Sequence, residues 1–378
     1  IMAIIVLQSK LKAALWGFFS GDALAAPTHW YYGGARQVMM DYNVINDYVK
    51  PKHNLSGSIM NKSNTNGGGR GRFSKGLGNI SIIGDVINHG KWEYWDPRKS
   101  IHYHATLQAG ENTLEASLAR VLMKSIVANN GKFNEDHFRK AYIDFMTTPG
   151  SHNDTYASTC HRMFFANMIF NKRDPKNCPD NDGHNVDTID GLILPTITAL
   201  AYSTNPNKEE AYTAVAQTTA VTRNSPTLIR MSRSLADVIW CALNSGQTQS
   251  NNDDNMLELS LTEAASSLGL RRPRITSSDG ISACYLHDSL PPLFDMMLKY
   301  SSSKYNNDVW TGVLANANAG GENVHRGSIL GAVLGAAGSK EAMSEKVISG
   351  LYHKIELEKE INDFVDCILK NTSSLEEF

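Results

Sequence analysis

Apolar residues recur along most of the chain at the spacing of amphipathic helices. In residues 113–128, Leu114, Leu118, Val121 and Leu122 follow one another at i, i+4, i+7 and i+8, which places them on one helical face. Alternating β-branched residues are nearly absent, with modest exceptions at 44–49 and 80–87. The pattern predicts helices at residues 9–26, 113–128, 135–146, 155–170, 187–203, 207–221, 226–244, 256–269, 289–300, 307–316, 326–337 and 340–370.

These helices are many and short, which predicts an all-α fold in which they pack as a globular, orthogonal multi-helix bundle. The chain has 378 residues, and one large helical domain over 1–378 accommodates them. Two long polar loops are expected at about 52–78 and 171–186. The first is rich in Gly, Ser and Asn and is either an ordered functional loop, with Arg70 and Arg72 holding a phosphate, or a flexible one.

Composition and charge exclude several kinds of partner. Hydrophobic residues make up 42% of the chain, and 36 basic residues stand against 38 acidic ones. We therefore expect neither nucleic-acid binding nor a membrane surface. No apolar run reaches the roughly 18 residues of a membrane span. The five cysteines lack metal-binding spacing, which predicts reduced thiols and a cytoplasmic location; a signal peptide at the apolar start is the competing interpretation.

Glycines recur every fourth residue in two predicted helices. Gly327, Gly331 and Gly335 form one stripe, and Gly17 and Gly21 continue into Ala25 in the other. Each glycine costs about 1 kcal/mol relative to alanine in a helix, whereas a glycine stripe lets a second backbone approach closely. We predict that these helices lie against each other with their polar ends facing one cavity, although two separately packed helices would give the same pattern.

A Gly-Glu-Asn sequence precedes two of the predicted helices, at 110–112 and at 321–323. Asn112 and Glu115 have the spacing of a capping box, which leaves Glu111 unexplained. If the two segments converge, their carboxylate and amide oxygens suit a hard cation such as Mg²⁺. A helix start also favours anionic groups such as phosphates.

Histidine, asparagine and aspartate also cluster in two further loops, at 152–154 and 184–187. Asp187 is either the cap of a helix from Thr188 or a group facing the same cleft. A histidine beside an aspartate can serve as a general base near neutral pH. His102 and His104 face either the cleft or solvent, and the aromatic residues 30–32 either stack on a base or sugar or join the core.

Four segments together resemble the ADP-ribosylglycohydrolase superfamily, which includes the J-class jellyfish lens crystallins. They are GFFSGDALAAPTHW (17–30), AGENTLEASLARVL (109–122), VTRNSP (221–226) and NAGGENVHRGSILGAVLGAAG (318–338). The resemblance implies an all-α fold and a cleft with two Mg²⁺ ions that bind ribose hydroxyls and a water. It also implies that an acid–base carboxylate assists cleavage at the anomeric carbon of ADP-ribose.

Position by position, the resemblance assigns metal ligands but also shows departures. Glu111, Asn112 and Thr113 stand where the family has its first aspartate pair and a threonine, and Glu322 stands at the first late aspartate. At the next family positions this chain has Val324 and His325, and His29 stands where many active members have glutamate. Valine offers no side-chain oxygen and histidine suits softer metals, so we expect one Mg²⁺ ion or none.

The candidate site residues fall into three groups. The predicted metal ligands are Glu111, Asn112, Thr113, Glu322 and His325. The predicted catalytic residues are Glu111, Glu322, Asp154, Asp187 and His152. The predicted substrate-binding residues are His29, Asn153, His184, Asn185, Gly320, Gly321, Asn323 and Arg326.

The sequence favours a hydrolase that cleaves an N- or O-ribosyl bond of an ADP-ribose-like small molecule or ADP-ribosylated substrate. Polar residues persist at the start of both glycine-rich helices, which supports a retained site. The alternatives are a catalytically inactive, crystallin-like or ligand-binding member of the same family, and a metal-independent hydrolase of another glycosidic or amide bond. The sequence leaves the oligomeric state open.

Overall fold

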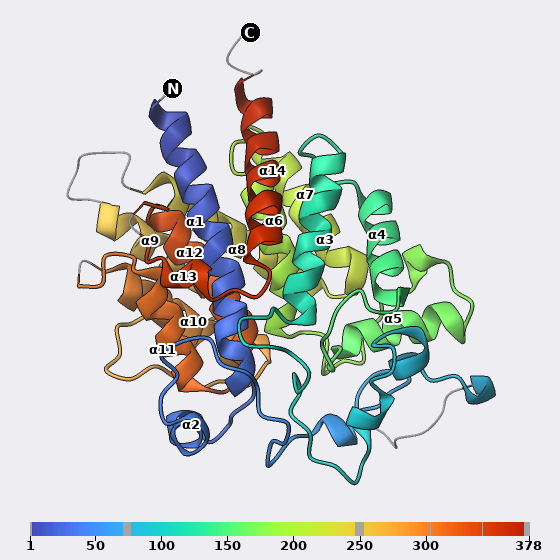
Figure 1. Cartoon of the computed structure of the whole chain (residues 1–378). Helices are drawn as coiled ribbons and strands as arrows, with labels where there is room; N and C mark the ends of the chain where they lie inside the picture. The colour runs from blue at the N-terminus through green and yellow to red at the C-terminus, as the bar shows by residue number, and fades with distance from the viewer. Residues whose placement is uncertain (1, 71–76, 246–252, 303, 342, 374–378) are drawn as a thin grey trace.

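The structure is a computed structural model that describes residues 2–70, 77–245, 253–302, 304–341 and 343–373. Helices dominate these residues, and β-structure is limited to isolated bridges (Figure 1). The all-α prediction is therefore confirmed. The α-helices are α1 (Met2–Ala25), α2 (Gly34–Tyr42), α3 (Leu114–Ala128), α4 (Glu135–Thr147), α5 (Thr159–Ile169), α6 (Ile193–Ala201), α7 (Lys208–Thr222), α8 (Pro226–Asn244), α9 (Asp253–Ser267), α10 (Leu286–Ser301), α11 (Val309–Ala319), α12 (Val324–Ala337), α13 (Lys346–Ser349) and α14 (Lys354–Ser373).

Some elements of the structure differ from the prediction. α2 was not predicted, and the helix predicted over 340–370 is divided into α13 and α14. The interruption includes Gly350, where a Cβ atom would lie 2.1 Å from Cδ2 of Tyr48. The close approach of the Tyr48 ring therefore requires glycine at this break. The segment 80–87 contains a π-helical turn (Ile82–Val86) rather than a strand.

The two glycine stripes are in contact, as predicted. A Cβ atom on Gly331 would lie 2.0 Å from the carbonyl oxygen of Gly17, and one on Gly21 would lie 2.0 Å from that of Gly327. The third contact joins Gly335 to Ala13 of α1, and not to Ala25, which was predicted as part of the stripe. Residue numbers increase along α1 while those of the contacting residues in α12 decrease, so the two helices are antiparallel. The short distances show that their backbones are in contact.

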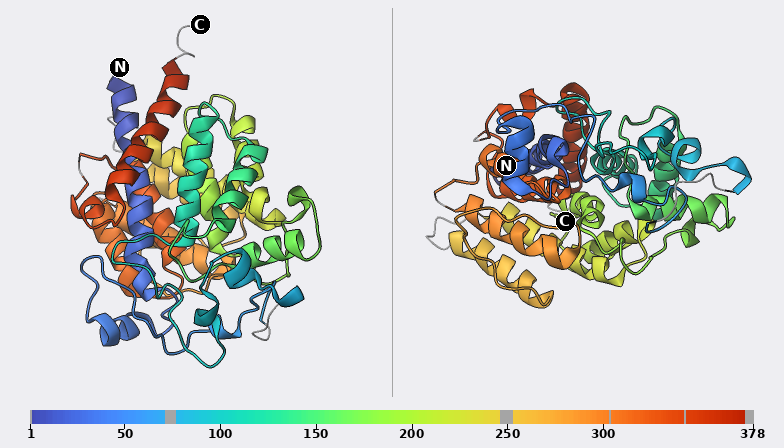
Figure 2. Two further views of the ribbon diagram at one scale, coloured as in Figure 1. Left: turned by 45° about the vertical axis from the view of Figure 1, so that its right-hand side comes forward. Right: turned by 90° about the horizontal axis from the view of Figure 1, so that it is seen from below.

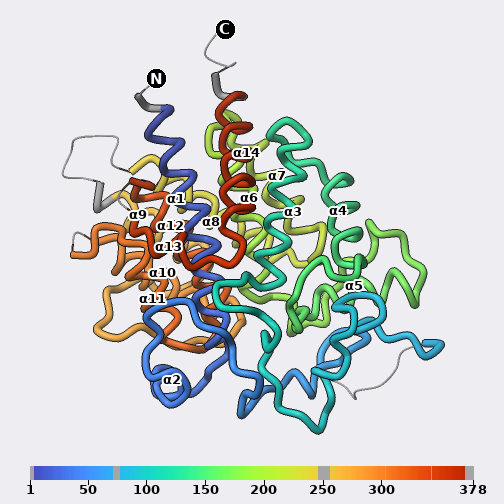
Figure 3. Tube along the Cα trace, in the orientation of Figure 1, coloured from blue at the N-terminus to red at the C-terminus, as the bar shows by residue number. Residues whose placement is uncertain are grey.

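This arrangement gathers three helix ends at one end of the molecule. The carboxyl end of α1 and the amino ends of α12 and α3 lie there, joined by hydrogen bonds described below. Figure 3 shows the long segment between α2 and α3 winding along this end. In its described residues, 43–70 and 77–113, the regular elements are the short turns η2 (Met60–Lys62), η3 (Leu77–Asn79), η4 (Ile82–Val86) and η5 (Trp92–Trp95).

The first and last helices run beside each other at the opposite end. α1 contacts α14 as well as α11 and α12 (Figure 2). Buried apolar side chains from Leu11 in α1 to Leu369 in α14 belong to one core cluster. Within the described residues, no helix combines the length and apolar character that crossing a membrane requires.

Both predicted loops have ordered parts. In the first, the buried guanidinium of Arg162 donates hydrogen bonds to the carbonyl oxygens of Asn64 and Gly67. Arg70 is exposed, and Arg72 lies outside the described residues, so the predicted phosphate cradle stays a prediction. The second loop includes the turn η6 (Pro175–Asn177), and Nδ2 of Asn167 donates to the carbonyl oxygen of Cys178.

Gly331→Ala tests the helix contact. Its new methyl group meets the backbone of α1, which cannot move aside without separating the two helices, so we expect a loss of about 3 kcal/mol in the free energy of unfolding. Gly67→Ala is the control, because its Cβ would lie 3.8 Å from the nearest atom, Nδ2 of Asn64; we expect a change within about 0.5 kcal/mol. Urea unfolding measures both, and equal losses would contradict the close contact.

Candidate functional site

A short backbone bridge joins the segment after α1 to the segment before α12. The N–H of Trp30 donates to the carbonyl of Gly321 at 2.7 Å, and the N–H of Gly321 donates to the carbonyl of Tyr31 at 3.0 Å. Gly320 and Gly321 both have left-handed φ angles, of 69° and 68°. A Cβ on Gly321 would lie 2.7 Å from the carbonyl oxygen of Ser282. These two glycines, predicted to bind substrate, therefore serve close packing, which brings His29 next to Glu322.

His29, Glu322 and His325 form a buried trio. Oε1 of Glu322 lies 2.7 Å from Nδ1 of His325, and Oε2 lies 2.9 Å from Nε2 of His29. The exposed fractions are 0% for His29 and Glu322 and 5% for His325. One ligand atom from each residue lies within 4.8 Å of the others. A carboxylate and two imidazoles that converge in this way could hold a metal ion.

A chain of hydrogen bonds continues from the trio to the start of α3. Nδ1 of His29 lies 2.7 Å from Nε2 of His104, and Nδ1 of His104 lies 2.8 Å from Oδ1 of Asp154. The other oxygen of Asp154 accepts the backbone N–H of Leu114 at 2.8 Å. We call His29, His104 and Asp154 the relay. The starts of α3 and α12 are therefore linked through the relay, and not by a direct pairing of the two Gly-Glu-Asn segments.

Aspartates from distant segments satisfy the first N–H groups of α3. Asp22 accepts the N–H of Thr113 at 2.8 Å and its hydroxyl at 2.6 Å, and it accepts Nδ2 of Asn112 at 2.9 Å. The N-cap residue of α3 is Thr113, and its own side chain makes no capping hydrogen bond. The predicted capping box of Asn112 and Glu115 is therefore wrong, because a long-range carboxylate supplies the acceptor instead.

The predicted metal ligands separate into two places. Glu111 accepts the N–H of Gln108 at 2.7 Å and Nδ2 of Asn153 at 3.1 Å. Asn112 and Thr113 donate to Asp22. Among the described residues, the group of acidic, histidine and cysteine side chains with metal-ligand spacing is the trio, which does not include Glu111. Glu111, Asn112 and Thr113 therefore do not join Glu322 and His325 in one ligand set.

The trio does not fit Mg²⁺, the ion that the resemblance implies. Mg²⁺ requires nearly octahedral oxygen ligands, whereas the trio offers two ring nitrogens and one carboxylate. Val324 is fully buried and contributes only hydrocarbon. The carboxylate of Asp22 is taken up by Asn112 and Thr113. An oxygen-rich Mg²⁺ site is therefore absent from the described part of these segments.

A small inner cavity lies between the starts of α3 and α12. Its lining residues include His325, Asp154 and Glu115. The volume open to the centre of a water molecule is about 10 Å³, which is room for one water. Nδ1 is the ring nitrogen of His325 that contacts Glu322, which leaves Nε2 for another partner.

Burial and neighbouring charges give His325 and Asp154 opposite charges. Burial disfavours the charged form of His325, but the carboxylate of Glu322 outweighs burial and raises the pKa of His325 to about 9. Burial also opposes ionisation of Asp154, but attraction and a hydrogen bond from His104 lower its pKa. Burial lowers the pKa of His29 to about 4. The cavity therefore combines a protonated histidine with an ionised aspartate.

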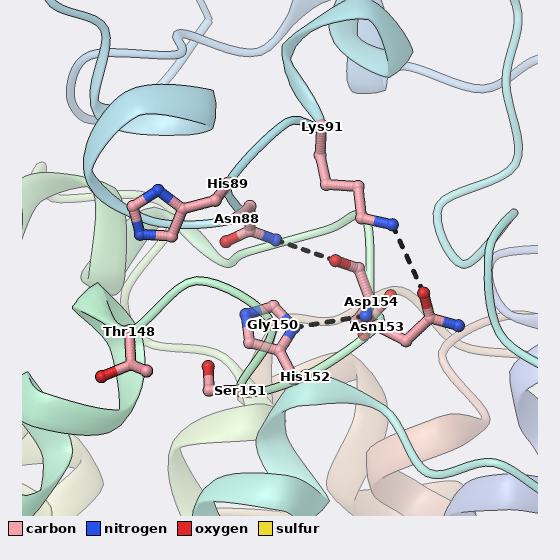
Figure 4. A pocket seen from close by; sticks show the side chains of 9 residues that line it. All are labelled: Asn88, His89, Lys91, Thr148, Gly150, Ser151, His152, Asn153 and Asp154. Carbon is pink, nitrogen blue, oxygen red and sulfur yellow. Dashed lines mark hydrogen bonds between the residues drawn. The ribbon is translucent and has the colours of Figure 1, made fainter.

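A larger outer cavity lies on the other side of Asp154 (Figure 4). Its volume is about 190 Å³, and segments 88–91 and 148–154 line it. Nζ of Lys91 lies 3.4 Å from Oδ1 of Asn153, and Nδ1 of His152 accepts the N–H of Asp154 at 3.2 Å. His152, Asn153 and Asp154, predicted as site residues, therefore share this cavity.

One wall of the outer cavity carries an unsatisfied acceptor. Nδ2 of Asn88 donates to the carbonyl of Asp154 at 3.2 Å. Its Oδ1 is buried and has no hydrogen-bond partner among the described residues. Buried polar atoms without partners are rare. Asn88 therefore presents an acceptor, while Lys91 supplies a positive charge beside it.

The second predicted histidine cluster lies elsewhere. His184 contacts the hydroxyl of Tyr285 at 2.6 Å, and Asn185 donates to Asp182. Asp187 accepts the hydroxyl of Ser225 at 2.5 Å. The turn η7 (Ile189–Leu192) begins after Thr188, with no side-chain cap. None of the three predicted residues lines the inner or outer cavity, and the prediction that Asp187 caps a helix is wrong.

The side chains of Arg326 and Asn323 also make hydrogen bonds to neighbouring segments of the protein. The guanidinium of Arg326 is fully buried and donates to Asn316, Gly280, Ser282 and Gly320. Asn323 donates to Thr28 and to the carbonyl of Ala317. These hydrogen bonds fix the segment before α12. They engage Nδ2 of Asn323, whereas its Oδ1 is buried and has no hydrogen-bond partner among the described residues.

Sequence reasoning missed several buried charges beside the inner cavity. Glu115 contacts Nε2 of His161 at 2.7 Å, and Arg223 pairs with Asp190 at 2.6 Å. His104 was left undecided, although its alternation with His102 was a signal. Asp22 was visible only as part of the opening motif, and its partners 90 and 91 positions away could not be read from local spacing.

The aromatic residues after α1 cover the trio. The ring of Trp30 stacks on His29 with centroids 4.0 Å apart, and its edges meet Tyr103 and Tyr156. Trp30 has a left-handed φ of 58°, a conformation that bulky residues rarely adopt. The aromatic cluster is therefore a cover over the histidines in this structure.

Asp190 predicts how stability depends on pH. Burial opposes its ionisation, but Arg223 outweighs burial and lowers its pKa from 3.8 to about 2. A lowered pKa contributes stability above about pH 4 that is lost as the pH falls toward 2. We expect the free-energy difference between wild type and Asp190→Asn to shrink by about 1 kcal/mol between pH 6 and pH 3.

Urea unfolding at both pH values checks this expectation. Thr198→Val is the control, because it removes a buried hydrogen bond to Thr218 of 2.8 Å without a titrating group. Its effect should be equal at both pH values. An Asp190→Asn difference that stays constant would contradict the ion pair's contribution.

The comparisons with known proteins agree with the sequence resemblance. The family model for ADP-ribosylglycohydrolase matches residues 5–374. A solved structure titled "ADP-ribosylglycohydrolase-related protein complex" has a TM-score of 0.56 and 14% identity, covering 96% of this chain and 99% of that chain. At this identity the likeness shows the fold alone. No curated protein matches the chain. Because the family model spans nearly the whole sequence, the chain belongs to the ADP-ribosylglycohydrolase family.

Proposed function

We propose that this protein is a hydrolase that cleaves an N- or O-ribosyl bond of an ADP-ribose-like substrate beside Asp154. One observation carries the proposal: Asp154 lines both the inner and the outer cavity. Asp154 therefore lies between a space for one water and a cavity that can hold a bound sugar. Family membership supports a glycosidic hydrolase in general.

The outer cavity suits a phosphorylated sugar. Lys91 supplies a positive charge for a phosphate, and the free Oδ1 of Asn88 accepts a hydrogen bond from a hydroxyl. Burial lowers the pKa of His152 to about 4, so the ring is neutral. Since Nδ1 accepts the N–H of Asp154, the ring proton is on Nε2, a further donor. A ligand with both anionic and hydroxyl groups satisfies all three residues.

The inner cavity supports an acid–base division of work. Glycosidic cleavage passes through a transition state that resembles an oxocarbenium ion, which the ionised Asp154 stabilises. The lowered pKa makes Asp154 a weak base, so charge stabilisation is its larger contribution and orientation of the attacking water its second. The raised pKa of His325 keeps it protonated at neutral pH, so it can donate a proton to the leaving group.

Access to the chemistry requires movement. The inner cavity admits one water, and the stacked ring of Trp30 covers His29. A sugar ring is several times larger, so the aromatic cover has to shift when substrate binds. The left-handed backbone of Trp30 stores strain at this place, which is typical of segments that move at functional sites.

A second candidate is a member of the family that binds a ligand without turnover. The complete burial of Glu322, with both oxygens engaged by histidines, favours it. In that case the outer cavity binds ADP-ribose and no hydrolysis follows. The two candidates share the cavity and differ in chemistry alone.

Binding of ADP-ribose tests the outer cavity. We expect calorimetry to detect it for the wild type, and Lys91→Met to weaken it about 10-fold, through the loss of one charge-assisted hydrogen bond. Lys99→Met is the control, because the ammonium of Lys99 is partly exposed and pairs with Glu93 at 4.0 Å, away from the cavity. Equal affinities for the two variants, or no heat for the wild type, would overturn the assignment.

Hydrolysis tests the role of Asp154. We expect Asp154→Asn to lower kcat on an ADP-ribosylated substrate about 100-fold or more. Asp187→Asn, in the cluster outside both cavities, should keep kcat within about 2-fold. Circular dichroism checks that both variants fold. Binding without turnover by the wild type would instead select the second candidate.

A further inference from the structure

The relay and Glu322 together contain one more hydrogen bond than two neutral imidazoles can supply. Three contacts join Glu322 to His29, His29 to His104, and His104 to Asp154. Each contact needs one proton between two acceptor atoms, because ionised carboxylates only accept. Two neutral histidines bring two protons. An additional positive charge, either a proton or a metal ion, is therefore required somewhere along this buried line.

A metal ion at the trio satisfies the line without an extra proton. If Nε2 of His29 holds a metal, its ring proton is on Nδ1 and donates to Nε2 of His104. The proton of His104 is then on Nδ1 and donates to Asp154. Every contact is complementary with two neutral rings. In metal sites, the ring nitrogen of a ligand histidine that does not bind the metal usually donates its hydrogen to an acceptor, which is often a carboxylate. Here His29 would donate to His104, which donates to Asp154.

We propose that His29, Glu322 and His325 bind a divalent first-row transition ion such as Zn²⁺, in place of the Mg²⁺ ions implied by the family. Two imidazoles and one carboxylate are the protein ligands of many catalytic zinc sites and of non-haem iron sites. The two contacts of Glu322, at 2.7 and 2.9 Å, are shorter than the roughly 3.3 Å between ligands on bonds of about 2.0–2.1 Å. The ion therefore replaces two shared protons while the side chains separate slightly.

The contacts of the trio agree with this exchange. The ion takes the place of the hydrogen between Glu322 and each of the two imidazoles, so binding releases protons. With the ion on Nδ1, Nε2 of His325 keeps its hydrogen, but the ring is a neutral ligand and no longer the protonated acid of the proposed reaction. The inference concerns metal binding, and its test does not use hydrolysis.

The test is metal binding by the tag-free full chain after dialysis against a chelator. Co²⁺ is the probe, because its visible absorption reports nitrogen and oxygen ligands, and calorimetry with Zn²⁺ gives the affinity. We expect one equivalent of either ion to bind the wild type, and millimolar Mg²⁺ to leave the Co²⁺ spectrum unchanged. Absence of binding, or displacement of Co²⁺ by Mg²⁺, overturns the proposal without any variant.

Variants then locate the bound ion. Glu322→Gln and His325→Gln should abolish the Co²⁺ spectrum, whereas His161→Gln should keep it. His161 is a matched control because it is also buried and contacts a glutamate, Glu115, at 2.7 Å. His104→Asn, a change at a positioning residue, should weaken Zn²⁺ binding about 10-fold. A spectrum that survives in both trio variants would assign the ion to another place and overturn the proposal.

Discussion

The rest of the structure depends on the backbone contact between α1 and α12. Their glycines bring carbonyl oxygens and α-carbons into direct contact, with no room for a methyl group between them. This contact sets the position of both helix ends, because two rods that touch along several turns cannot slide past each other. His29 follows one end and Glu322 precedes the other, so their hydrogen bond is a consequence of the packing above them.

The site that results is a line of carboxylates and imidazoles buried in a helical core. Burial alone would drive each group to its neutral form. Mutual attraction outweighs burial at Glu322 and Asp154, whose pKa values are lowered, and at His325, whose pKa is raised. It does not do so at His29. The difference follows from the neighbouring charges: Asp190 and Glu115 add to the attraction of Glu322 at His325, whereas His104 and His325 oppose it at His29.

The parts that depend on local or periodic signals could be predicted from the sequence. The four-residue spacing of Gly17 and Gly21 against Gly327 and Gly331 encodes a surface for close approach, and the structure confirms it. The residues that cap the helices are harder to predict from the sequence. The acceptors for the start of α3 are Asp22 and Asp154, which come from distant segments, so the local spacing of Asn112 and Glu115 was misleading. A side chain's target is set by the fold and not by its neighbours in sequence.

The walls of the outer cavity come from segments outside the long helices, at 88–91 and 148–154, whereas the trio is held by the contact between α1 and α12. This separation has an evolutionary consequence. Substitutions or insertions at 88–91 can reshape what the cavity accepts without changing the trio or the contact between α1 and α12. Relatives with one chemistry and different ligand preferences are then accessible by changing the periphery alone.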